Sequence, residues 1–193
     1  MSVLLASEAL LPHLAPIADR LRAVTVEIES SGGGGAGLLW ASDLVVTNAH
    51  VARASCVRVG LDDHRQVEAR LVAADRGADL AVLRIPESGV APAAVADSDD
   101  VRVGAIVVAL GHPRGLRRTL TAGVVHAVGP LVRGGRRWIH ADVRLAPGNS
   151  GGPLADAAGR VVGINTMIAG GLALAIPIDD VRRFVATVGA SAP

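Results

Sequence analysis

The sequence predicts an all-β fold with a helix at each end, and three observations support that prediction. Short segments rich in Val, Ile and Leu follow one another along most of the chain, and Gly, Pro or Asp separates them. A polar stretch that contains a proline, residues 87–100, divides these segments into two similar groups. Apolar residues at helical spacing stand before and after the segments. Many short strands in this arrangement are typical of a barrel or a sandwich.

The first predicted element is a helix over residues 8–22, where Leu10, Leu14, Ile17 and Leu21 recur at helical spacing. Beyond this helix the apolar pattern changes to that of short strands. The strands are expected at residues 23–29, 36–41, 43–47, 56–61, 66–74, 80–85, 105–110, 118–128, 136–141, 160–166 and 172–177.

The last predicted element is a helix over residues 180–188, which Asp179 is expected to cap. Aspartate suits a cap because its side chain accepts hydrogen bonds from the free amides of the first turn. The apolar face of this helix is expected to comprise Val181, Phe184, Val185 and Val188.

The composition excludes several classes of function. The chain has 193 residues, half of them apolar, and a formal net charge of +1, so we expect a soluble globule of one large domain or two small ones. Such a balanced charge gives no electrostatic reason to expect nucleic acid, and the basic segment 133–137 is read as a solvated hairpin tip. All 19 basic residues are arginine, which excludes a Walker A lysine, a Schiff base and a Ser/Lys pair.

The single cysteine, Cys56, has no partner for an internal disulfide, and we expect it to be a small buried residue. No Cys/His cluster has the spacing of metal ligands, so neither a metal nor another cofactor is expected. No apolar run approaches the roughly 20 residues of a membrane span, and no signal peptide is evident. As written, the sequence predicts a cytoplasmic protein, or a periplasmic or secreted one if an export signal has been removed.

A serine framed by glycines, Ser150, is the strongest candidate for a reactive group. Residues 148–152 fit the G-x-S-x-G nucleophile turn of α/β-hydrolases. Those enzymes place their acid and histidine after the serine, whereas the last histidine of this chain is His140. A catalytic serine here therefore needs partners that precede it.

Two residues before Ser150 fit the roles of base and acid. His50 follows a strongly apolar strand, and turn-like residues come after it. Asp79 opens a later strand, where a carboxylate can lean into the core. Asp75 competes for this role but is read as a turn residue. The order His, Asp, Ser is that of the chymotrypsin template.

The motifs TNAHV (47–51), DLAVL (79–83) and GNSGGPL (148–154) together resemble the trypsin-like serine proteases of the HtrA (Deg) family. The resemblance extends to residues 109–116 and 163–177 and so covers nearly the whole chain. It implies a chymotrypsin-like double six-stranded β-barrel with an active site between the barrels. The implied domains are an N-terminal helical segment at 1–22, a first barrel at 23–95, a second barrel at 96–178, and a C-terminal helix and tail at 179–193.

The chemistry of these residues suits acyl transfer. Ser150 is a poor nucleophile until a base removes its proton, and His50 suits that task because imidazoles exchange protons near neutral pH. Asp79 would orient the imidazole and stabilise its charged form. The glycines permit tight backbone angles, so the amides of Gly148 and Ser150, with Asn149 between them, can converge on an oxyanion.

Two readings of the specificity pocket stay open. Arg144 lies six positions before the nucleophile, at the base of the pocket in trypsin-like proteases, and would favour an acidic P1 residue. Leu145, together with Met167 and Ile168, matches the apolar lining by which HtrA proteases accept small aliphatic P1 residues. A buried guanidinium is costly unless a carboxylate such as Asp142 pairs with it, so we expect cleavage after Val, Ala, Ile or Leu.

The sequence therefore predicts a serine endopeptidase that cleaves unfolded or extended polypeptide segments without ATP. The resemblance further implies that Thr166 supports the catalytic aspartate and that the backbone at 167–168 holds the substrate. The alternative is a peptide-binding or chaperone-like scaffold with an idle triad.

Two departures from the family pattern concern assembly. Only residues 189–193 follow the last predicted helix, so no PDZ domain is expected. HtrA proteases usually trimerise through aromatic residues near the start of the protease domain, whereas the one Phe and two Trp of this chain lie elsewhere. A homo-oligomer stays open, but the sequence does not favour a trimer.

Overall fold

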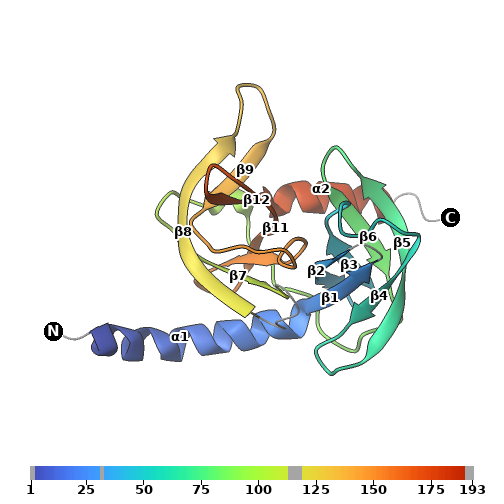
Figure 1. Cartoon of the computed structure of the whole chain (residues 1–193), viewed down its shortest axis with the longest axis horizontal. Helices are drawn as coiled ribbons and strands as arrows, with labels where there is room; N and C mark the ends of the chain where they lie inside the picture. Colours follow the sequence, from blue (N-terminus) through green and yellow to red (C-terminus); the bar gives the residue numbers. More distant parts are fainter. Residues whose placement is uncertain (1–2, 31–32, 113–118, 190–193) are drawn as a thin grey trace.

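Two closed antiparallel barrels make up most of the computed structural model, which describes residues 3–30, 33–112 and 119–189 (Figure 1). The first barrel has the strand order β1-β2-β3-β6-β5-β4. It closes because β1 pairs with both β2 and β4. Its strands are β1 (Thr25–Ser30), β2 (Gly33–Ala41), β3 (Leu44–Thr47), β4 (Cys56–Gly60), β5 (Gln66–Asp75) and β6 (Leu80–Arg84).

The second barrel has the strand order β10-β11-β12-β9-β8-β7 and closes because β10 pairs with both β11 and β7. Its β8–β9 hairpin projects beyond the rest of the molecule, at the top of Figure 1. Its strands are β7 (Ile106–Gly111), β8 (Thr119–Pro130), β9 (Arg137–Ala141), β10 (Pro153–Asp156), β11 (Val161–Ala169) and β12 (Leu172–Pro177).

The expected all-β double barrel with a helix at each end is confirmed. Each segment expected as a strand contains one, with ends shifted by a few residues, although residue 118 lies outside the described residues. The boundary predicted between residues 95 and 96 falls in the connection between β6 and β7. The sequence does not predict β10, because its glycine- and proline-rich surroundings have the composition of a loop.

The strands bury every second side chain in the core. In β4, Val57 and Val59 are buried and Arg58 between them is exposed, which is the pattern of a strand with one face in the core. The two barrels also share a hydrophobic cluster, in which Leu38 of β2 joins Ile164 of β11. Because one cluster spans both barrels, their relative position is fixed by burial of apolar surface.

The N-terminal helix, α1 (Val3–Val24), is longer than expected and packs against β1 and β7. Ile17 and Leu21 are buried and Leu14 packs against the core, whereas the side chain of Leu10 lies outside those that the structure describes. Neither helix in the described part of the chain has the length and hydropathy of a membrane span.

The C-terminal helix, α2 (Ile178–Gly189), packs against β6, β11 and β12 and so contacts both barrels. It begins at Ile178, so the expectation that Asp179 caps it is wrong. The Asp179 carboxylate instead accepts a hydrogen bond of 2.9 Å from the Ser98 amide in the connection between the barrels. The expected apolar face is confirmed, since Val181 is buried in the core and Phe184, Val185 and Val188 pack against it.

Candidate active site

His50 and Asp79 meet at the end of two neighbouring strands of the first barrel. His50 lies just after β3, Asp79 stands just before β6, and these strands pair antiparallel. The imidazole Nδ1 of His50 lies 2.9 Å from Oδ2 and 3.0 Å from Oδ1 of Asp79. The backbone N–H of His50 also donates to Oδ1 of Asp79, at 3.1 Å. A proton on Nδ1 leaves Nε2 as the basic nitrogen, which is the tautomer that a general base requires.

Asp79 has a left-handed backbone conformation, with φ of 54°. Such a conformation costs a non-glycine residue on the order of 1–3 kcal/mol and persists only where the surroundings enforce it. One of these surrounding groups is the Asn48 side chain, whose Nδ2 donates to the carbonyl oxygen of Asp79 at 3.0 Å. No role for Asn48 follows from the sequence pattern, although this residue lies two positions before His50 in the same motif.

The Asp79 carboxylate is held in its ionised form by hydrogen bonds. Thr166 Oγ1, on β11 of the second barrel, donates to Asp79 Oδ2 at 2.6 Å. Burial raises the pKa of Asp79, but the hydrogen bonds from His50 and Thr166 outweigh it and leave that pKa below its ordinary value. An ionised acid beside the imidazole can stabilise the positive charge that the imidazole acquires during proton transfer.

Ser150 lies on a turn that glycine makes possible. The φ values of Gly148 and Gly151 are 107° and 85°, a region that residues with a side chain rarely adopt. A Cβ on Gly151 would lie 2.1 Å from the carbonyl oxygen of Ala36 in the first barrel. The Ala36 amide in turn donates to the Ser150 carbonyl at 2.8 Å. The serine is therefore fixed against the first barrel, on the side where His50 lies.

The Ser150 hydroxyl does not point to the base in this conformation. Its Oγ donates to the carbonyl oxygen of Thr166 at 2.9 Å, and the described residues show no hydrogen bond between Ser150 and His50. Rotation about the Cα–Cβ bond of Ser150 would free the hydroxyl to approach His50. Catalytic hydrogen bonds often tighten only when substrate is bound.

Two of the three amides predicted for an oxyanion hole remain available. The N–H groups of Gly148 and Ser150 make no backbone hydrogen bond with other described residues. The Asn149 N–H differs, because it donates to the carbonyl oxygen of Ala146 at 3.0 Å. The amides of Gly148 and Ser150 therefore stay candidates for an oxyanion hole, whereas the Asn149 amide closes the turn onto Ala146.

The predicted nucleophile and the predicted base both line a cleft of about 180 Å³, to which residues of both barrels contribute. Ser150 also lines a second pocket, of about 290 Å³, together with five other predicted site residues. The lining of this pocket comprises Leu145, Ala146, Pro147, Asn149, Ser150, Thr166, Met167 and Ile168.

Arg144 is exposed and is not among the described residues that line this pocket. Its backbone carbonyl accepts a hydrogen bond of 3.1 Å from Thr121. Asp142, the carboxylate considered as its partner, is also exposed, and no ion pair joins the two among the described residues. The structure therefore brings Leu145, Met167 and Ile168 to the pocket and leaves the Arg144 side chain in solvent.

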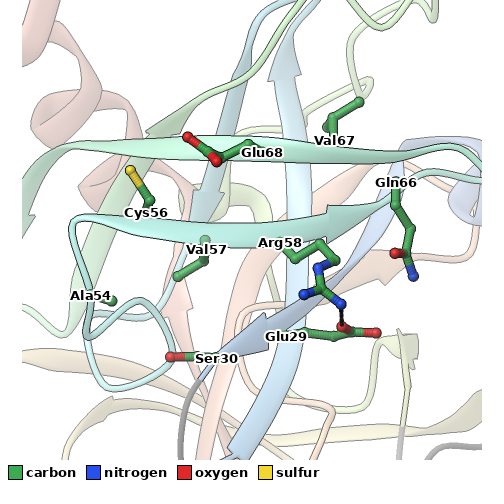
Figure 2. Close-up of a pocket in the computed structure, with 9 residues that line it drawn as sticks. All are labelled: Glu29, Ser30, Ala54, Cys56, Val57, Arg58, Gln66, Val67 and Glu68. Carbon is green, nitrogen blue, oxygen red and sulfur yellow. Dashed lines mark hydrogen bonds and ion pairs between the residues drawn. The ribbon is translucent and has the colours of Figure 1, made fainter.

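Another cavity lies away from the predicted triad, on the outside of the first barrel (Figure 2). It has a volume of about 670 Å³ and contains the ion pair between Arg58 and Glu29. Cys56 also lines it and is exposed, so the expectation of a buried cysteine is wrong. The physical reason is the alternation along β4: Val57 faces the core, and Cys56 must share the outer face with Arg58.

One group of carboxylates has the spacing of a cation site among the described residues. Single oxygens of Asp97, Asp99 and Asp179 lie within 4.8 Å of one another. Arg137 pairs with Asp99, and Arg182 pairs with Asp179, so arginines already compensate this negative charge. Nothing in the arrangement requires a metal ion.

The sequence matches the family described as "Trypsin-like peptidase domain" over residues 35–164. It is 38% identical over 190 residues to "Protease Do-like 1, chloroplastic" of Arabidopsis thaliana, and 40% identical over 164 residues to "Putative serine protease HhoB" of Synechocystis sp.. The two alignments cover 90% and 78% of this chain but only 43% and 39% of the relatives. The chain thus spans about two fifths of the length of these curated relatives.

Solved structures of HtrA-type proteases have the same fold. The "HtrA-type protease AlgW with tripeptide" superposes with a TM-score of 0.85 at 30% identity, over 90% of this chain and 62% of that chain. The same protease with a decapeptide gives a TM-score of 0.84 at 26% identity, over 92% and 67%. Because the family match covers well over half of the sequence, the chain belongs to the trypsin-like peptidase family, and its relatives place it among the HtrA (Deg) proteases.

Proposed function

We propose that the chain is a serine endopeptidase in which Ser150 is the nucleophile, His50 the general base and Asp79 the acid that orients the base. One observation carries the proposal: the His50 imidazole is fixed 2.9 Å from the Asp79 carboxylate and shares a cleft with Ser150. This arrangement supplies an activated base at the position from which it can remove the proton of a serine hydroxyl.

The reaction begins when the Ser150 hydroxyl turns away from the Thr166 carbonyl toward Nε2 of His50. Its oxygen attacks the carbonyl carbon of the scissile bond while His50 takes its proton. The imidazolium is stabilised by Asp79 and then gives this proton to the departing amine. A water molecule, activated by the same imidazole, releases the acyl group from Ser150 in the second half of the reaction.

The oxyanion formed in each half is stabilised by the N–H groups of Gly148 and Ser150. Both amides belong to a turn that is held by hydrogen bonds to its neighbours, including that from the His112 amide to the Gly148 carbonyl at 3.1 Å. Donors that are held in place before the reaction need no reorganisation when the charge develops.

The proposed substrates are extended or unfolded polypeptide segments with small aliphatic P1 residues. Leu145 offers an apolar wall to the pocket beside Ser150, while Met167 and Ile168 are 43% and 55% exposed. These two residues lie on β11 beyond the part that pairs with β10, so an extended peptide can pair with the strand there. Globular proteins present few such segments, which suits the chain to protein quality control.

The orientation of Ser150 favours a second candidate, a peptide-binding or chaperone-like scaffold with an idle triad. In that case the hydroxyl would stay on the Thr166 carbonyl when peptide binds. The cleft and the exposed stretch of β11 would then bind extended segments without cleaving them.

Labelling with a fluorophosphonate probe distinguishes the two candidates. The endopeptidase predicts stoichiometric modification of Ser150, which is lost in Ser150→Ala, because only an activated serine displaces the fluoride. A folded chain that binds peptide but does not react with the probe would exclude the peptidase and support the scaffold.

A further inference from the structure

Arg136 of the second barrel reaches across to the first barrel beside the predicted acid. It stands just before β9, and its guanidinium lies over the ring of Trp138, 4.4 Å from the centroid. Its Nη1 donates to the carbonyl oxygen of Ala78 at 2.6 Å and to that of Gly77 at 3.4 Å. Its Nη2 lies 3.9 Å from Oδ2 of Asp180 on α2. One side chain thus joins both barrels and the C-terminal helix.

The Ala78 carbonyl belongs to the peptide group that leads directly into Asp79. The same residue is held on its other side, because the Ala78 amide donates to Oδ1 of Asp75 at 2.9 Å. With Asn48 donating to the Asp79 carbonyl, hydrogen bonds to the side chains of three different residues fix the backbone on both sides of the left-handed position. Arg136 is the one of these three that comes from the second barrel.

The peptide between Ala78 and Asp79 sets the φ angle of Asp79. If its carbonyl loses the charged donor, the peptide can rotate and Asp79 can relax from φ of 54° toward an ordinary value. That rotation would carry the carboxylate away from Nδ1 of His50. Arg136 is only partly exposed, at 27%, and stacks on buried Trp138, so its guanidinium is pre-organised for this contact.

We propose that Arg136 is a positioning residue: it holds the Ala78 carbonyl so that Asp79 keeps its strained conformation and stays on His50. The proposal rests on the proposed peptidase function and adds a residue that touches neither the substrate nor the reacting atoms. It also makes the rate of cleavage depend on the β8–β9 hairpin, from whose end Arg136 extends.

Steady-state kinetics on a peptide substrate test the proposal. Arg136→Met should lower kcat by about 10- to 100-fold with KM changed less than about threefold, because misplacement of the acid slows the chemical step and leaves the substrate pocket intact. Arg136→Lys, which keeps one charged donor, should recover part of the loss. The matched control is Arg137→Met, since Arg137 belongs to the same hairpin but pairs with Asp99. Its kcat should stay within about threefold of wild type.

A double-mutant cycle shows whether the effect passes through Asp79. In an Asp79→Asn background, Arg136→Met should reduce kcat by less than about twofold, because the group that it positions has already lost its charge. A full additional loss in that background would overturn the proposal. So would an Arg136→Met variant that keeps kcat within twofold of wild type, or one in which the loss is confined to KM.

Melting curves identify variants that do not fold at the assay temperature. If Arg136→Met is one of them, Arg136→Lys is used for the test instead. This substitution must lower kcat at least about threefold in the chain that keeps Asp79, and it must not do so in the Asp79→Asn variant. Failure of the peptidase proposal looks different: the wild-type chain would neither hydrolyse peptide nor react with a fluorophosphonate.

Discussion

The Thr166 hydroxyl donates a hydrogen bond of 2.6 Å to Asp79 Oδ2, although the two residues belong to different barrels. The carbonyl oxygen of the same threonine accepts the hydroxyl of Ser150. Thr166 therefore connects the predicted acid to the predicted nucleophile, and the geometry of the site depends on how closely the barrels pack.

Thr166→Val tests this connection, because valine keeps the shape of threonine and removes the donor. A hydrogen bond to a charged group contributes about 1.5–3 kcal/mol, so we expect kcat to fall about tenfold or more. Steady-state hydrolysis of a peptide substrate measures this fall in kcat. Thr187→Val is the control, since the Thr187 hydroxyl also donates a hydrogen bond, but to the backbone carbonyl of Phe184 on α2 and not to a carboxylate. Equal activity of the two variants would show that the Thr166 hydroxyl is dispensable.

The lowered pKa of Asp79 predicts how stability depends on pH. A carboxyl whose pKa is lower in the folded than in the unfolded state stabilises the fold above the unfolded value, about 3.9, and this contribution is lost as pH falls through the folded value. The difference in unfolding free energy between wild type and Asp79→Asn should therefore shrink between pH 5 and pH 3. Urea unfolding at these pH values measures the difference. If this difference in unfolding free energy grows on acidification, the pKa of Asp79 is not lowered by folding.

Removal of a member of the predicted triad should abolish hydrolysis. Ser150→Ala or His50→Ala should slow degradation of an unfolded casein-type substrate by at least about 10³-fold, and the double variant should be hardly slower, because the triad acts as a unit. His126→Ala is the matched control, since His126 is exposed on β8. Wild-type rates in either triad variant would refute the assignment.

The pocket beside Ser150 predicts the P1 preference. We expect cleavage after Val, Ala, Ile or Leu, and an unchanged profile in Arg144→Ala, because the Arg144 side chain is exposed and does not line the pocket. Leu145→Phe should shift the profile toward Ala, since a larger ring fills the pocket. A peptide-library cleavage profile measures both. Dominant cuts after Asp or Glu that vanish in Arg144→Ala would support the acidic preference instead.

Gly151→Ala should disrupt the turn that carries the nucleophile. The new Cβ would combine a positive φ with a contact of 2.1 Å to the Ala36 carbonyl, so we expect a loss of at least about 2 kcal/mol in unfolding free energy and loss of activity. Gly170→Ala separates the two causes, because Gly170 also has positive φ but no atom within 4 Å of its Cβ position. Chemical denaturation compares the variants, and equal losses would show that the Ala36 contact is harmless.

Most of the strands and the identity of the triad candidates follow from the sequence. Alternating apolar residues indicate strands such as β4 because a strand turns every second side chain toward the core. The same alternation places Cys56 on the outer face with Arg58. Ser150 could be selected because glycines frame it, and His50 and Asp79 because each stands at the end of an expected strand, in the order of the chymotrypsin template.

The sequence by itself determined which residues can act, and the tertiary structure decided how they are held. The contacts of Thr166 and Arg136 with the turn that carries Asp79 join the two barrels, and no local pattern encodes such contacts. The direction of the Ser150 hydroxyl also depends on the Thr166 carbonyl, which packing brings within 2.9 Å. Local composition and periodicity report the conformation of short segments, whereas these hydrogen bonds exist only because the shared core fixes one barrel against the other.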